Sequence, residues 1–266
     1  MKHVMRYFKS FVLCIFVFTL LIISSSNIVV CQKNTEKFRD FKSDGFYHTL
    51  NFAVNLNSGN EEYVKYAGDY RIDLYRQNFI TYLAGNIEYK EGNESVITNK
   101  GFAHWRLIYN RGSFVEPELF AQIEYNDFIL LKDRKLAGGG IRLALIDLVS
   151  KDSLNKFLME MGLGLMYEYE EVDDPVKPIT KYFRSTNFIS LRFSINSSID
   201  FFSVTYLQPY INNFDDYRLL NENRLQFSIS KNFAFYISSV YRYDNEPHTN
   251  LKYYDLEILN GLTLSF

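Results

Sequence analysis

The chain has 266 residues, a formal net charge of −2 and 17% aromatic residues, with 21 Tyr and 24 Phe but a single Trp. The length suits one large all-β domain better than two small ones. The balanced charge excludes the basic surface that neutralises the phosphates of nucleic acid, so no nucleic-acid partner is expected. Phe and Tyr favour β-strands, and Tyr also suits the interface between a membrane and water.

Residues 1–31 have the pattern of a secretory signal peptide. A basic start precedes a largely apolar run at 11–23, which is shorter than the ~20 residues of a membrane-spanning helix. We expect cleavage after Cys31, export through the general secretory pathway and residence in the outer membrane of a Gram-negative cell. Two alternatives are an uncleaved anchor and a lipoprotein with lipid on Cys31, although Val30 is large for a lipidation site.

Both cysteines of the chain belong to this leader. Cys14 lies within the apolar run and Cys31 lies at its predicted cleavage site. The mature chain is therefore expected to contain no disulfide, although it crosses an oxidising compartment. A barrel that is closed by its own backbone hydrogen bonds does not need one.

Segment 32–46 is polar and predicts a short flexible lead-in, whereas 47–266 alternates between apolar and polar residues with a period of two. This alternation indicates strands with two different faces. The expected strands are 47–58, 62–75, 79–91, 97–110, 115–127, 136–147, 156–170, 181–195, 198–210, 215–229, 232–244 and 251–266. The predicted fold class is therefore all-β, a single antiparallel transmembrane β-barrel of about twelve strands, with ten as the alternative count.

A soluble β-sandwich is the alternative fold, because its strands also alternate. Two features weigh against it. The expected strands have about a dozen residues, whereas sandwich strands average five or six. Aromatic residues such as Tyr206, Tyr210, Tyr241 and Tyr243 lie near strand ends, where the two aromatic girdles of a membrane barrel would be. The longest candidates for external loops are three polar segments, 148–155, 171–180 and 245–250.

The C-terminal segment predicts an assembly signal. Leu262, Leu264 and Phe266 alternate along the last strand, and Asn260 interrupts the apolar pattern that precedes them. Such a tail is typical of the strand that the barrel assembly machinery binds, because an exposed edge pairs with the receptor while alternate side chains fill its pockets. The other expected partners are membrane lipid and lipopolysaccharide, and the barrel is expected to be a monomer.

If the apolar faces contact lipid, the polar faces line the lumen. The candidates are Glu88, His104, Arg106, Gln122, Glu124, Arg142, Glu160, Glu168, Arg184, Arg192, Glu222, Arg224, Arg242 and Glu257. One interpretation is a polar core in which Arg and Glu neutralise each other and narrow the interior. The other is a water-filled pore whose charged rings select solutes. Both give the protein a structural or narrow-pore role in the cell envelope.

No catalytic residue, cofactor or metal is expected. An outer-membrane phospholipase or deacylase centred on His104 is the alternative function, but no Ser accompanies this histidine in a recognisable pattern. The acidic clusters at 61–62, 168–174 and 215–216 lack the spacing of a calcium loop and are interpreted as solvated loops. A further alternative makes these loops a docking site for an external partner. The glycine run 138–140 is expected to let the backbone bend or a bulky neighbour pack inside the barrel.

One further pattern extends over most of the predicted barrel, from about Gly85 to Phe266. Its residues are Asp133-Arg134, Gly138-Gly139-Gly140, Glu160, Gly162, Gly164, Tyr167, Tyr169, Arg184, Asn223-Arg224, Tyr243, Pro247, Asp255-Leu256 and Leu264-Ser265-Phe266. In these residues the chain resembles a bacterial family of salt-induced, or salt-stress-induced, outer-membrane proteins. The resemblance implies a barrel in the outer membrane and supplies no activity.

Overall fold

The computed structural model describes residues 43–57, 62–92, 95–149, 156–176, 178–247 and 252–265. The predicted leader 1–31, most of the lead-in 32–46 and the final Phe266 lie outside the described residues, so they remain predictions. No helix in the described part of the chain is long and apolar enough to cross a membrane.

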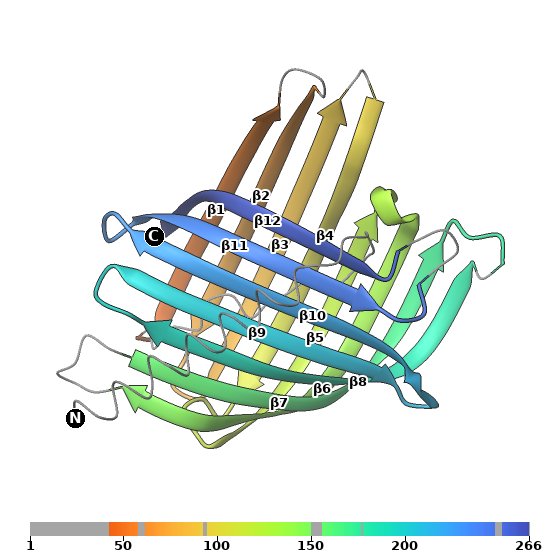
Figure 1. Cartoon of the computed structure of the whole chain (residues 1–266). Helices are drawn as coiled ribbons and strands as arrows, with labels where there is room; N and C mark the ends of the chain where they lie inside the picture. Colours follow the sequence, from red (N-terminus) through yellow and green to blue (C-terminus); the bar gives the residue numbers. More distant parts are fainter. Residues whose placement is uncertain are drawn as a thin grey trace, which may run out of the picture.

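Twelve antiparallel strands follow one another in chain order (Figure 1). They are β1 (Gly45–Asn57), β2 (Tyr63–Tyr75), β3 (Phe79–Gly92), β4 (Ser95–Tyr109), β5 (Val115–Asn126), β6 (Leu131–Val149), β7 (Lys156–Val172), β8 (Ile179–Ser194), β9 (Ile199–Tyr210), β10 (Asn213–Ser228), β11 (Phe233–Asp244) and β12 (Tyr254–Ser265). Each strand pairs with the next, and β1 pairs with β12, so the sheet closes into a barrel. The predicted fold class is confirmed with twelve strands, and the sandwich alternative is wrong.

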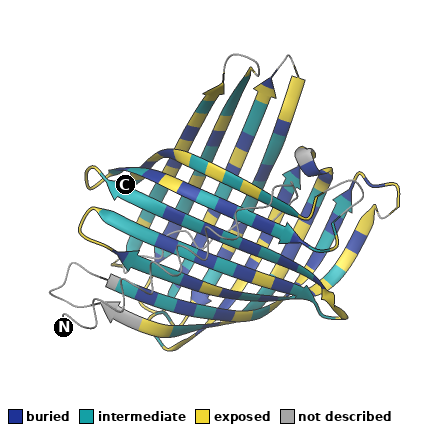
Figure 2. Cartoon of the chain, viewed as in Figure 1, coloured by how far each residue is buried: buried dark blue, intermediate teal, exposed yellow. Residues whose placement is uncertain are grey.

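The alternation of the sequence becomes the two faces of the barrel wall (Figure 2). Along β5 every second residue from Glu116 to Asn126 is buried, and the residues between them lie on the outer wall. Two of these outer side chains, Leu119 and Ile123, are 55% and 56% exposed. Apolar side chains take most of the outward positions on the other strands as well, and such a surface is what a membrane barrel presents to lipid.

The connections between strands divide between the two ends of the barrel. We call the end where β1 begins and β12 ends the terminal end, and the other the opposite end. Because neighbouring strands are antiparallel, the connection between β7 and β8, at 173–178, lies at the opposite end, and so does the one between β11 and β12. The connection between β6 and β7 lies at the terminal end. The segments 148–155, 171–180 and 245–250, all predicted to be external loops, therefore do not share one end of the barrel, and the parts of them at 150–155 and 248–250 lie outside the described residues.

Strand β6 begins five residues earlier than expected, at Leu131 instead of residue 136. The charged residues from Lys132 to Lys135 fall between the expected strands 115–127 and 136–147. In the structure these side chains alternate across the wall, with Lys135 exposed on the outside and Arg134 completely buried on the inside. Burial of Arg134 is tolerable because carboxylates of the lumen pair with it.

The glycines of β6 and β7 make room for aromatic rings inside the barrel. A Cβ atom at Gly162 would overlap with the ring of Phe188, and one at Gly138 would come within 2.6 Å of Cζ of Phe120. Both glycines are therefore required by a close neighbour, and neither has a positive φ angle. The predicted role of the 138–140 run, packing of a bulky neighbour, holds for Gly138.

Candidate functional site: the ion-paired lumen

The structure places the sequence-predicted lumen candidates on the inner side of the wall. Their positions have the same parity as the buried residues of each strand, and neighbouring strands are in register, so inward positions face one another. Arg142 and Glu168 have no exposed surface, whereas Arg192 is only partly buried. Many of these charged side chains, together with several that the sequence did not single out, form three networks of ion pairs.

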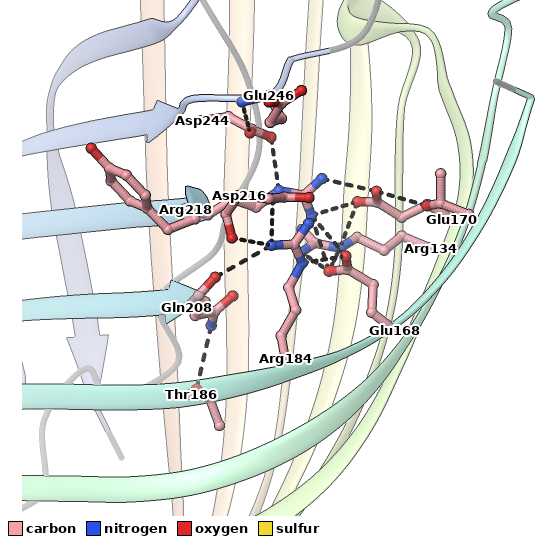
Figure 3. Close-up of polar contacts among 12 residues, drawn as sticks. Arg134, Glu168, Glu170, Arg184, Thr186, Gln208, Asp216, Arg218, Asp244 and Glu246 are labelled. Carbon is pink, nitrogen blue, oxygen red and sulfur yellow. Dashed lines mark hydrogen bonds and ion pairs between the residues drawn. The ribbon is translucent and has the colours of Figure 1, made fainter. Parts of the chain in front are cut away.

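The first network is centred on Glu168 of β7, which accepts hydrogen bonds from arginines of three other strands (Figure 3). Nε of Arg134 in β6 lies 3.1 Å from Glu168 Oε2, and Nε of Arg184 in β8 lies 3.0 Å from Oε1. Nη1 of Arg218 in β10 lies 3.0 Å from both carboxylate oxygens. Strands β8 and β9 separate β7 from β10, so the bonds of Arg218 cross the interior instead of following the sheet.

Three further carboxylates complete this Glu168 network. Glu170 binds both terminal nitrogens of Arg218 at 2.9 Å. Asp216 lies 2.9 Å from Nη1 of Arg184, and Asp244 of β11 lies 2.8 Å from Nε of Arg218. The network therefore joins β6, β7, β8, β10 and β11 near the opposite end of the barrel. Three arginines face four carboxylates, so the charges nearly cancel.

The second network is centred on Glu257 of β12 and also lies near the opposite end. Nζ of Lys65 in β2 is 2.5 Å from Glu257 and 3.1 Å from Glu88 in β3. Lys100 in β4 is 2.8 Å from Glu88 and 3.5 Å from Glu257. Arg242 in β11 lies 3.7 Å from Glu257, and its other carboxylate, Asp255, is 3.2 Å away. In this Glu257 network, pairs between β12 and β4 span the three strands that separate them.

The third network lies toward the terminal end and is centred on Glu118 of β5. Nη2 of Arg142 in β6 lies 2.9 Å from Glu118, and Nη1 of Arg106 in β4 lies 3.4 Å from it. The same Arg142 also binds Glu160 of β7 at 3.1 Å, and the Ser190 hydroxyl donates to Glu160 at 3.4 Å. The Glu118 network thus connects strands from β4 to β8. It adds a second level of paired charges, closer to the terminal end than the first two networks.

Together the Glu168 and Glu257 networks surround most of the lumen near the opposite end. Their ion-paired side chains, with Glu124 at 3.7 Å from Arg134, come from β2 to β8 and from β10 to β12. Charged groups at this depth are tolerated only when oppositely charged partners and hydrogen bonds satisfy them. The arrangement can therefore narrow the lumen and hold its walls together. Any path that remains through the lumen is lined by polar groups.

The remaining predicted candidates lie outside these networks. Arg224 of β10 donates to Asn51 of β1 at 3.2 Å and to Thr263 of β12 at 2.5 Å, and its guanidinium lies 3.8 Å from the centre of the Tyr236 ring. Glu222 is buried on the same inner face of β10. Arg224 therefore links β10 to the two strands that close the barrel.

His104 also lies inside the barrel. Its ring is stacked between those of Tyr82 and Phe120, with centroids 5.9 and 6.2 Å away, and Nδ1 lies 3.0 Å from Oε1 of Gln122. The Gln122 amide in turn donates to Glu124 at 3.0 Å. A lipid-modifying site needs its histidine on the outer wall, where acyl chains are, so this inward position does not favour the enzymatic alternative.

Sequence reasoning missed several members of the networks. They are Lys65, Lys100, Glu118, Arg134, Glu170, Asp216, Arg218, Asp244 and Asp255. Arg134 falls between two expected strands, and Glu170 and Asp216 belong to acidic clusters that were interpreted as loops. The others lie within expected strands but were not selected as lumen candidates. The signal that could have found them is parity, because each shares the phase of the inward residues on its own strand.

The interpretation of the acidic clusters as solvated loops is wrong for three of their residues. Glu168 and Glu170 belong to β7, Asp216 belongs to β10, and all three are buried in ion pairs. Asp173 does lie in a connection, where it is exposed and 2.9 Å from Nζ of Lys132. Among the described residues, no group of three or more His, Cys, Asp or Glu is arranged to hold a metal ion.

Solved structures with a similar fold are membrane barrels. The KdgM porin aligns with 84% of this chain and 99% of its own, at 11% identity and a TM-score of 0.44. The NanC porin aligns with 83% of this chain and 98% of its own, at 14% identity and a TM-score of 0.45. The translocator domain of the autotransporter NalP from Neisseria meningitidis aligns over 85% and 90%, at 9% identity and a TM-score of 0.42.

At the level of sequence, no curated protein matches the chain. The resemblance to salt-induced outer-membrane proteins stays a prediction in that detail. One family model does match, over residues 50–266, and it covers all but the first few residues of the described barrel. The chain therefore belongs to the family described as DUF481, a protein family of unknown function.

Proposed function

We propose that the chain is an integral barrel of the Gram-negative outer membrane that acts as a narrow ion pore and has no catalytic activity. The observation that carries this proposal is the set of ion pairs that cross the lumen between strands that are not neighbours, such as Arg218 to Glu168 and Lys100 to Glu257. A barrel of this size without such pairs would leave a wider path, because its strand number lies between small packed barrels and open porins.

The pairs also explain why a large solute is not the expected cargo. A solute must displace charged groups that hold each other at 2.5 to 3.7 Å in the Glu257 network, and separating buried partners leaves both uncompensated. A small ion can instead exchange with one carboxylate or one ammonium group at a time, as in filters built from charged side chains. The proposed pore therefore admits small ions and excludes larger solutes.

Single-channel recording of the refolded protein in a planar bilayer tests this proposal. We expect small, steady conductance steps from the unmodified protein. Glu168→Gln removes the carboxylate that holds three arginines, so we expect larger steps and a reversal potential shifted toward anions. Asp133→Asn is the matched control, because Asp133 is next to Arg134 in sequence but pairs with Lys135, which is exposed on the outer wall, at 2.5 Å.

The result that would contradict the pore is a lack of conductance in both the unmodified protein and Glu168→Gln while both still show the heat-dependent gel migration of a folded barrel. That outcome would leave a structural role in the envelope. Equal conductance changes in Glu168→Gln and Asp133→Asn would contradict the specific role given to the Glu168 network.

A further inference from the structure

The outer wall of the barrel carries a belt of polar side chains at mid-height, where a membrane barrel normally presents only apolar groups. We call it the polar belt. Its members point outward from five consecutive strands, β8 to β12, and they are uncharged. They are Ser185, Asn187, Ser203, Thr205, Asn221, Asn223, Ser239 and Asn260. Strand register places these residues beside one another, since Thr205 pairs with Asn221 and Asn223 pairs with Ser239.

The belt lies at the centre of each strand and not at its ends. On the outer face of β10, the two asparagines are preceded by Tyr217 and Leu219 and followed by Leu225 and Phe227. On β11, Ser239 has Phe235 and Ile237 on one side and Tyr241 and Tyr243 on the other. Aromatic residues of this kind occupy the two membrane interfaces. The belt therefore lies in the middle of the hydrocarbon layer.

The rest of the wall differs at the same height. On β1 to β7 the central outward residues are apolar or have no side chain. They are Phe52, Gly68, Gly85, Ala103, Ala121, Gly139 and Leu163. Thr81 is an outward polar residue of β3, but it lies only two residues from the start of its strand. The outer wall at mid-height is thus apolar on β1 to β7 and polar on β8 to β12.

Hydrogen bonds within the belt use only part of its capacity. The Asn221 amide donates to Thr205 Oγ1 at 2.9 Å, and the Asn223 amide donates to Asn221 Oδ1 at 2.7 Å. Asn187 donates to the Ser185 hydroxyl at 2.9 Å. Each Asn side chain offers two N–H groups and an oxygen with two lone pairs. The three amides each make a second, longer bond of 3.4 Å, to the Val204 carbonyl, the Ser239 hydroxyl and the Leu207 carbonyl respectively. Among the described residues, the belt groups left for a partner are therefore mainly acceptors, such as Oδ1 of Asn223, together with the Asn260 amide. Leaving such polar groups unpaired in acyl chains is costly.

We infer that the polar belt is the interface with a second copy of this chain, arranged about a two-fold axis. The belt is neutral and contains donors and acceptors together, so the same surface can satisfy itself in an isologous dimer. Polar side chains of this type join membrane segments to each other. A lipid headgroup does not reach mid-height. The five strands, at about 4.8 Å spacing, make a surface about 19 Å wide on one side of the barrel, which is a face for one partner.

This inference does not depend on the proposed pore, and it replaces the expectation of a monomer. Cysteine cross-linking of the full chain in outer membranes tests it. Asn221→Cys and Asn223→Cys place a thiol at the centre of the belt, and Ala121→Cys places one at the centre of the outer wall of β5 as a matched control. With an oxidant, we expect a disulfide-linked product of twice the monomer mass from at least one belt variant and none from Ala121→Cys.

A double variant, Asn221→Leu with Asn223→Leu, supplies the second measurement. It makes the centre of β10 apolar, so the barrel keeps its outer wall and the belt loses its central polar groups. We expect light scattering in mild detergent to give twice the monomer mass for the unmodified protein and the monomer mass for the variant, with unchanged heat-dependent gel migration. A monomeric unmodified protein, a dimer that persists in the double variant, or a cross-link to a different protein would overturn the inference.

Discussion

The lumen has no room for a side chain at Gly162. The ring of Phe188 occupies the space that a Cβ atom would need, and Arg142 lies over the same ring at 4.9 Å from its centre. Gly162→Ala should therefore lower the free energy of unfolding by about 1–3 kcal/mol, the usual cost of overpacking a core. Gly68→Ala on the outer wall is the control, because nothing lies within 4 Å of a Cβ atom there. Urea titration of folded barrel in detergent micelles measures both, and equal midpoints would contradict this account of the glycine.

Residues of the lumen also show what sequence reasoning could and could not reach. Parity along each strand identified inward positions such as Glu88 and Glu257 without any structure. It could not pair them, because the pairs join residues that are far apart in the chain: Lys65 and Glu257 are 192 positions apart. Which inward charges meet depends on the number of strands and on their stagger, and neither is written in the alternation of a single strand.

At the scale of the strand, β12 gives the sharpest test of the outer wall. Leu262 and Leu264 point outward and are 42% and 43% exposed. Leu262 lies closer to the centre of the strand than Leu264, and the cost of a charge on the lipid face falls toward the interface. Leu262→Arg should make folding into lipid less favourable by about 2–4 kcal/mol, and Leu264→Arg should have a smaller effect. Folding titrations in lipid vesicles measure this difference. Equal, negligible losses would mean that this face of β12 does not contact acyl chains.

Strand boundaries were predictable wherever polar turns interrupt the alternation, as between β9 and β10, and less so where charge enters a strand. The early start of β6 is the clearest failure, since Arg134 looks like a loop residue until Glu168 is placed opposite it. Asn260 is a second case. It breaks the apolar pattern of the last strand, and only the neighbouring strands show that it continues a belt.

At the scale of the whole molecule, the antiparallel order fixes which connections share a side of the membrane. If the terminal end faces the periplasm, the connection at 173–178 faces the cell exterior and the turn at 195–198 does not. An epitope tag inserted after Val176 should be stained by antibody on intact cells, and the same tag inserted after Ser197 should be stained only after the cells are opened. Staining of the second insertion on intact cells, without staining of the first, would reverse the orientation.

The joint between β1 and β12 is much shorter than the others. Among the described residues the two strands are in register over four residue pairs, from Thr49 with Ser265 to Phe52 with Leu262, whereas β1 and β2 match over thirteen. Because these strands are also the most distant in sequence, their ladder is the slowest to find and the cheapest to separate. The ladder between β1 and β12 is therefore the weakest joint of the barrel. We therefore expect the pairing of β1 with β12 to form last during assembly and to open first when the barrel is inserted or released sideways.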